Sequence, residues 1–256
     1  MKLNQISHCI FVCVLLLLVL NGCTLKGKSK SLKVAVRMDV PGFGFKNAND
    51  DYYYGFEIDV AKALAESMPG YNGVELYGAD ARNREELLSS GKVDCVIACY
   101  EKTSERAEKF SFSAPYYYDS LYLLVEKSLL FDELSADETV SIGVASGTDA
   151  KDKLLTSEFL NFPKNFKIVE FQTYQNGIKM LETGNVDAIF SDGGILHQFK
   201  SKDRQMIKLE SETSDVVYRI ATQKDSSLAQ HIDTALKSLI EFGKIEEIRA
   251  NWFDHS

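Results

Sequence analysis

The sequence lacks the excess of positive charge that a polyanion would need. Its 256 residues carry 29 lysines and arginines against 37 acids, so the formal net charge is −8. A surface that binds nucleic acid is basic, and this balance argues against a nucleic-acid partner. It still leaves room for a local basic pocket.

Cysteine is scarce, and three of the five cysteines lie in the first 23 residues. The other two, Cys95 and Cys99, stand four residues apart in an apolar segment that we expect to be a strand. Four strand residues span about 13 Å, whereas a disulfide needs Cα atoms within about 7 Å. We therefore predict two free buried thiols. No histidine or further cysteine clusters nearby, so we expect no metal site there, and no cofactor.

An apolar run long enough to cross a membrane is also missing. The N-terminal run, Ile10 to Leu20, falls short of the roughly 20 residues that a spanning helix needs, and it has the length of a signal-peptide core. The segment that ends at Cys23 resembles a lipobox, which predicts a lipoprotein signal peptide over 1–22 and acylation of Cys23. A plain signal peptide is the alternative.

Residues 23–31 are then expected to be a lipid-anchored, basic linker. Removal of residues 1–22 takes away one lysine and no acid, which leaves 28 bases against 37 acids and a net charge of −9.

Two segments of the sequence resemble each other, and this internal repeat predicts the architecture. Residues 87–97 (LLSSGKVDCVI) and 180–190 (MLETGNVDAIF) each have the pattern of a helix end, a glycine cap and a short apolar strand. Strands expected at 32–39 and 140–148 begin the two units, and helices are expected at 56–67, 84–88, 150–155, 174–182, 195–199 and 227–242. Alternating strands and helices predict parallel sheets covered on both faces.

The repeat therefore predicts an α/β protein with two Rossmann-like lobes. Residues 32–122 with 219–256 would form lobe 1, and residues 123–218 would form lobe 2. Strand-like segments at 120–127 and 215–224 would cross between the lobes as a hinge. Ligands of open α/β sheets bind beyond the carboxyl ends of the strands, so these ends should meet in one cleft.

Seven segments in order then carry a resemblance: DVPGFGF (39–45), GFEIDVAKALAE (55–66), NREELLSSGKVD (83–94), KTSERAEKFSFSAPYY (102–117), IGVASGT (142–148), GNVDAIFSD (184–192) and GKIEEIRANWF (243–253). Together, over residues 32–253, they resemble the extracellular solute-binding proteins of polar amino acid ABC importers. The resemblance implies a hinged clamp of the periplasmic-binding-protein type that closes on a free amino acid. It is nearest to the branch that binds glutamate or aspartate.

The resemblance implies roles for three residues at the strand ends. Arg106 would fork onto the ligand α-carboxylate, Asp192 would hold the α-ammonium, and the turn at Thr148 would add donors to the carboxylate. The alternatives are a solvated arginine, an aspartate that caps the next helix, and an ordinary N-cap.

Arg37 and Arg84 carry the specificity argument, because two guanidinium groups near a side-chain subsite would favour a ligand with a second carboxylate. Alternatively, each pairs with a nearby protein acid. Thr103 is a further candidate contact, and Phe43 is expected at the rim of lobe 1.

Glu101 departs from the family pattern, which has threonine at this position. Its carboxylate would repel the ligand carboxylate unless it turns to solvent, pairs with Arg37 or Arg84, or selects a ligand with an extra cation. The last two outcomes would remove the case for an acidic ligand.

Three functions are compatible with these residues. The first is a lipid-anchored binding protein, monomeric and on the extracytoplasmic face of a bacterial membrane, that passes its ligand to an ABC permease. The second is a dehydratase or lyase that uses Glu101 as its acid. The third is a ligand sensor for a membrane partner. The first, which involves no catalysis, is the expected one.

Overall fold

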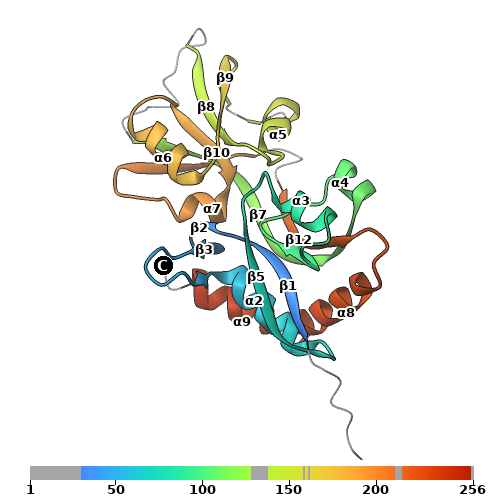
Figure 1. Cartoon of the computed structure of the whole chain (residues 1–256). Helices are drawn as coiled ribbons and strands as arrows, with labels where there is room; N and C mark the ends of the chain where they lie inside the picture. Colours follow the sequence, from blue (N-terminus) through green and yellow to red (C-terminus); the bar gives the residue numbers. More distant parts are fainter. Residues whose placement is uncertain (1–29, 128–137, 158, 161, 211–214, 255–256) are drawn as a thin grey trace, which may run out of the picture.

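The computed structural model describes residues 30–127, 138–157, 159–160, 162–210 and 215–254. The predicted signal peptide, Cys23 and most of the linker lie outside the described residues. Figure 1 shows two lobes, one above the other, joined by long strands that run from one into the other.

Each lobe has a core of parallel strands. Lobe 1 has the strand order β5-β1-β6, and lobe 2 has the order β10-β8-β9, with all neighbours in these two sets parallel. The bounds are β1 (Lys30–Arg37), β5 (Tyr71–Ala79) and β6 (Cys95–Ile97) in lobe 1, and β8 (Val140–Ala145), β9 (Phe166–Phe171), β10 (Ala188–Asp192) and β11 (Arg204–Lys208) in lobe 2.

Two long strands connect the lobes, β7 (Phe110–Glu126) and β12 (Asp215–Gln223). The first part of β7 pairs with β12, and its last part pairs with β10 and β11, in each instance antiparallel. The predicted parallel strands are present in each lobe, and the two connecting strands add antiparallel pairs to them. The connecting strands return in the opposite direction to the repeat units, so the sheet is mixed.

Helices cover both faces of the sheet. Lobe 1 carries α2 (Phe56–Ser67), α3 (Arg84–Ser89), α4 (Ser104–Lys109), α8 (Ser227–Glu241) and α9 (Lys244–Phe253), and lobe 2 carries α5 (Ala150–Thr156), α6 (Tyr174–Glu182) and α7 (Gly193–His197). Strand β1 is buried on both sides, since Val34 and Val36 join one apolar cluster and Ala35 joins another. A parallel strand covered on both faces has this pattern. As expected, the C-terminal helix α8 packs on lobe 1, against β7 and α2.

The backbone conformation and hydrogen bonds confirm the internal repeat. Gly91 and Gly184 both have left-handed φ angles, 72° and 69°, directly after their helices. Asp94 Oδ2 then accepts the β1 amide of Lys33 at 2.9 Å, and Asp187 Oδ2 accepts the β8 amide of Ser141 at 2.7 Å. The same sequence signature therefore builds the same helix-to-strand connection in both lobes.

Helix α7 begins at Gly193, two residues before the predicted start. Gly193 and Gly194 both lie in its first turn. They are needed for space: an added Cβ would lie 2.6 Å from the Tyr122 ring at Gly193 and 2.5 Å from the Tyr117 hydroxyl at Gly194.

A small antiparallel sheet, β2 (Asp39–Val40), β3 (Gly44–Lys46) and β4 (Tyr53–Tyr54), follows β1. Cys95 and Cys99 are buried free thiols, as predicted. Within the described ranges, no helix is both long and apolar enough to cross a membrane.

Candidate functional site

The strand ends of the two lobes meet around one cavity. Lobe 1 contributes Arg37, Arg84, Cys99 and Glu101, and lobe 2 contributes Thr148, Asp149, Ala150, Lys153, Tyr174, Ser191, Asp192 and Ile195. The cavity volume is only about 10 Å³, which is close to the minimum for one water molecule. The lobes are therefore closed on each other, and an amino acid enters only when groups in the cleft move.

Arg37 forms an ion pair within lobe 1. Its Nε and Nη2 atoms donate to the two oxygens of Asp39 at 2.8 and 2.9 Å, and its side chain is 2% exposed. Burial acts to lower the pKa of Arg37, but the Asp39 carboxylate outweighs this and raises the pKa above its ordinary value. Of the two roles predicted for Arg37, the structure shows the alternative one, in which it pairs with a nearby protein acid.

Arg84 is buried without such a partner. Its guanidinium donates to the carbonyls of Ala98 and Cys99 at 2.7 and 3.0 Å, and among the described residues no carboxylate pairs with it. Its Nε, also buried, has no hydrogen-bond acceptor in the described chain. Burial lowers the pKa of Arg84, and the nearby Arg106 and Arg37 add to the effect. A buried cation of this kind is costly unless an anion compensates it.

Arg106 lies beside Arg84 but outside the lining of the cavity. Both guanidinium carbons lie over the Tyr100 ring, at 4.6 and 4.5 Å from its centroid. Arg106 Nε donates to Glu85 at 3.1 Å, and its Nη1 donates to the carbonyl of Glu101 at 3.2 Å. The alternative of a solvated arginine is therefore not seen, since the side chain is only 8% exposed.

Glu101 pairs with a residue that sequence analysis did not identify. Lys153 reaches from α5 across the cleft and places its Nζ 2.6 Å from Glu101 Oε1 and 3.2 Å from Asp149 Oδ2. The second oxygen, Oε2, accepts the amide of Val217 at 3.4 Å. None of the three outcomes proposed for Glu101 includes this lysine.

The cluster is rich in carboxylates. Burial, with the charges of Asp192 and Asp149, raises the pKa of Glu101 to about 8 against the opposing effect of Lys153. The same acids raise the pKa of Lys153, although its burial acts to lower it. Three acidic side chains thus surround one ammonium group, and two of them, Glu101 and Asp192, have raised pKa values.

Asp192 lies at the lobe 2 side of the cavity, where it accepts a hydrogen bond from the Tyr218 hydroxyl of β12. Its side chain makes no capping bond to α7, so the proposed alternative role is not seen. Burial raises the pKa of Asp192. Thr148 is engaged locally, since its hydroxyl donates to the Ala145 carbonyl at 2.7 Å and accepts from the Ala150 amide at 3.3 Å.

Two other predicted residues do not line the cavity. Thr103 caps α4 by accepting the Arg106 amide at 3.2 Å. Phe43 is fully buried in an aromatic cluster, with ring centroids 5.0 Å from Tyr117 and 5.8 Å from Tyr218. These ring contacts explain why Phe43 lies behind the rim of lobe 1 and not at it.

The lobes also come into close contact at Gly147. Its φ is 79°, and an added Cβ would lie 2.7 Å from the carbonyl oxygen of Ala81 in lobe 1. Arg84 Nη2 also donates to the Gly147 carbonyl, at 3.4 Å. On the far side of the cleft, Gln175 donates to the Asp39 carbonyl at 3.2 Å.

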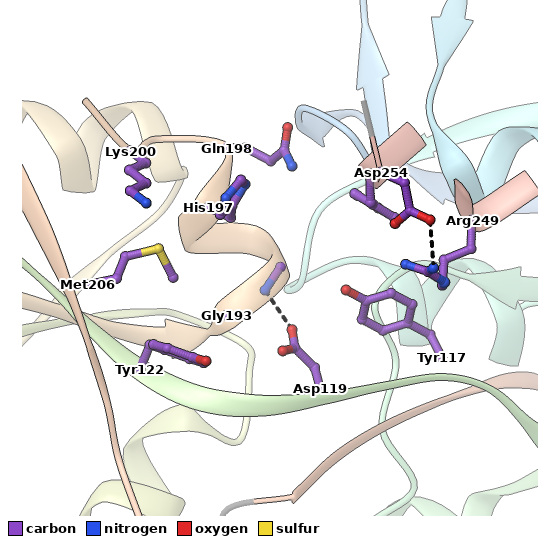
Figure 2. A pocket seen from close by; sticks show the side chains of 12 residues that line it. Tyr117, Asp119, Tyr122, Gly193, His197, Gln198, Lys200, Met206, Arg249 and Asp254 are labelled. Atoms are coloured by element: carbon purple, nitrogen blue, oxygen red, sulfur yellow. Dashed lines mark hydrogen bonds and ion pairs between the residues drawn. The ribbon is translucent and has the colours of Figure 1, made fainter. Parts of the chain in front are cut away.

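A larger cavity of about 400 Å³ lies between α7, β7 and α9. Figure 2 shows Asp119 directed at the first turn of α7, with Tyr117 and Arg249 on the opposite wall. Asp119 already accepts the Gly194 amide at 2.6 Å, and Arg249 already pairs with Glu246 and Asp254. Because Asp119 and Arg249 already have partners, the smaller cavity, where Arg84 lies without an ion pair among the described residues, is the stronger candidate for the ligand site.

The fold and this cleft define a two-lobed ligand-binding clamp. The family model of bacterial extracellular solute-binding proteins, family 3, matches residues 32–255, and the chain belongs to that family. The chain is 26% identical over 219 residues to the ABC transporter glutamine-binding protein GlnH of Bacillus subtilis, covering 85% of this chain and 79% of the relative.

Two further comparisons agree. ABC transporter arginine-binding protein 1 of Escherichia coli is 26% identical over 233 residues, covering 88% of this chain and 91% of the relative. The structure of the amino acid ABC transporter substrate-binding protein AbpA from Streptococcus pneumoniae, bound to L-arginine, superimposes with a TM-score of 0.76 at 27% identity, covering 88% of this chain and 94% of AbpA.

Proposed function

We propose that this protein captures a free polar amino acid in the cleft between its lobes. The observation that carries the proposal is that Arg84, a buried guanidinium without a carboxylate partner in the described chain, lines the same cavity as Asp192 of the other lobe. A free amino acid supplies the missing carboxylate and an ammonium group for Asp192.

In this proposal the ligand bridges the lobes. Arg84, supported by Arg106 at the same aromatic ring, holds the α-carboxylate from lobe 1. Thr148 adds a donor from lobe 2, and Asp192 holds the α-ammonium. Contacts made to both lobes exist only in the closed state, so ligand binding shifts the equilibrium toward closure.

The prediction of an acidic ligand assumed that the guanidinium groups of both Arg37 and Arg84 are free to bind its side-chain carboxylate. Asp39 occupies the Nε and Nη2 edge of Arg37 and compensates its charge, whereas Arg84 has no carboxylate in an ion pair among the described residues. We therefore propose a polar amino acid without narrowing it to glutamate or aspartate, and both are included in the test below.

We also propose that Cys23 is acylated and that the domain is tethered to the outer face of a bacterial membrane, as a monomer, where it delivers its ligand to an ABC permease. The names of the relatives, which describe binding proteins of amino acid ABC transporters, support the transport role. The apolar run before Cys23 supports the anchor.

Binding without catalysis fits the contacts of Glu101. Both of its carboxyl oxygens are engaged, one by Lys153 and one by the Val217 amide, so neither is directed at a substrate. A dehydratase or lyase would need this acid to be available, and a sensor would need a membrane partner in place of the permease.

The test is calorimetric titration of the purified full-length chain in mild detergent with each of the twenty amino acids. We expect one polar class to bind, and we expect Arg84→Ala and Arg106→Ala to reduce affinity at least a hundredfold. Arg249→Ala, in the larger cavity, is the matched control and should bind as the wild type does. Failure of the wild type to bind any amino acid would overturn the proposal, as would wild-type affinity in both pocket variants.

A further inference from the structure

The Lys153 ammonium group lies among the acidic side chains of the cleft. It bridges Glu101 of lobe 1 and Asp149 of its own lobe, and the charge of Asp192 acts on it as well. The side chains of Glu101 and Lys153 are 12% and 18% exposed, so water screens the pair weakly.

This lysine also fills the site. The cavity that remains beside it is about 10 Å³, whereas sites for small-molecule ligands have volumes of several hundred Å³. Arg84 at the same cavity stays without a carboxylate partner among the described residues. The closed cleft therefore holds a cation of its own, while Arg84 makes no ion pair among the described residues.

Withdrawal of Lys153 has a consequence for its partners. Glu101, Asp149 and Asp192 would then form a group of three carboxylates that face the cleft without an ammonium group. The α-ammonium of an incoming amino acid compensates one of them. A second cation on the ligand compensates another, because each charge left unpaired in a closed cleft is strongly unfavourable.

We propose that the cleft works by cation exchange: a cationic side chain of the ligand displaces the Lys153 ammonium group from Glu101 and Asp149, so the ligands are amino acids with a second cation. This inference rests on the proposed function and narrows it to one class of ligand. The Lys153 side chain is then the competitor that a ligand must replace, and it determines which ligands succeed.

The experiment compares the wild type with two variants of the full-length chain, using lysine, arginine, glutamine and glutamate as probes. Lys153→Ala removes the charge and opens space, whereas Lys153→Met removes the charge and keeps most of the volume. Lys151→Met is the control, because Lys151 lies on the same helix, half exposed, and pairs with Glu170 at the surface.

We expect the wild type to bind lysine and arginine at least tenfold more tightly than glutamine or glutamate. Both Lys153 variants should bind lysine at least tenfold more tightly than the wild type does, and Lys151→Met should match the wild type. A gain in Lys153→Ala alone would overturn charge competition, since it would assign the effect to space. Equal or weaker lysine binding in both variants, or a preference for glutamate, would overturn the inference while the proposed function stands. If no amino acid binds to any of these proteins, the proposed function itself fails.

A second measurement follows closure without ligand. Hydrogen exchange of the segments 99–106 and 146–157 should be faster in Lys153→Met than in the wild type, because the contact across the cleft is lost. Unchanged exchange in both segments would contradict a role of Lys153 in holding the cleft.

Discussion

Two ion pairs line the cleft, and they differ in whether their partners belong to the same lobe. Arg37 and Asp39 both lie in lobe 1, two residues apart, whereas Glu101 and Lys153 come from different lobes. The first pair stays together when the lobes separate, because both partners belong to lobe 1. The second reaches water when the lobes separate. The difference indicates that one pair maintains the fold and the other responds to ligand.

Removing one partner of the pair inside lobe 1 has the largest expected effect. Asp39→Asn leaves Arg37 buried with its charge uncompensated, so we expect the free energy of unfolding to fall by about 3–5 kcal/mol. Chemical denaturation measures it. The control is Asp51→Asn, which breaks the exposed pair of Lys46 and Asp51 and should leave stability unchanged. Equal stability of Asp39→Asn and the wild type would show that the pair is not essential to lobe 1.

A substitution at the lobe contact should affect closure more than folding. Gly147→Ala places a Cβ 2.7 Å from the Ala81 carbonyl only while the lobes are closed, so we expect the affinity for amino acid to fall more than tenfold. Gly184→Ala is the control. Its φ is similar, 69°, but an added Cβ meets no atom within 4 Å.

Both glycine variants should lose about 1 kcal/mol of stability from left-handed backbone strain, and only Gly147→Ala should lose affinity as well. Calorimetry and denaturation of the two variants separate the effects. If both variants bind as the wild type does, the contact at Gly147 does not belong to the binding-competent state.

Breaking the pair between the lobes should have a smaller effect on stability. After Glu101→Gln, the lobes can separate and Lys153 retains Asp149, so the loss is limited by the free energy of opening. We expect about 1 kcal/mol in denaturation, well below the loss in Asp39→Asn. A loss as large as that of Asp39→Asn would remove the distinction between the two pairs.

Sequence analysis was most successful where the contacts are local. The repeat formed by residues 87–97 and 180–190 predicted both helix-to-strand connections. The glycine, the valine and the aspartate that build each connection lie close together in sequence. The partner of Arg37 agrees with the alternative of a nearby protein acid for the same reason, since Asp39 is only two residues away.

The partner of Glu101 could not be found in this way, because Lys153 is 52 residues away and belongs to the other lobe. A weaker indication existed. Lys153 stands four residues after Asp149 and hence on the same side of the predicted helix, facing the cleft. The bonds of Arg84 to the carbonyls of Ala98 and Cys99 depend on the turn after β6, whose path the sequence does not specify.

The smallest expected effect is a pH dependence of ligand binding, and it concerns only the pair between the lobes. Burial, with the charges of Asp192 and Asp149, raises the pKa of Glu101 to about 8, against the opposing effect of Lys153. Near pH 7 the closed cluster therefore holds more protons than the same groups would in water. A ligand that brings an additional cation stabilises the carboxylates and releases protons. Binding of lysine should then tighten as the pH rises from 6 to 8, by up to about tenfold per pH unit for each proton released.

Titration of lysine at pH 7 in two buffers of different ionisation enthalpy measures the release directly. Glu101→Gln should show less release and a flatter pH profile, whereas Lys151→Met should behave as the wild type does. Identical heats in the two buffers would mean that the ligand does not change the charge of the cluster. Glu101 and Lys153 would then be a fixed ion pair that holds the lobes closed and that no ligand displaces, just as Arg37 and Asp39 are a fixed pair within lobe 1.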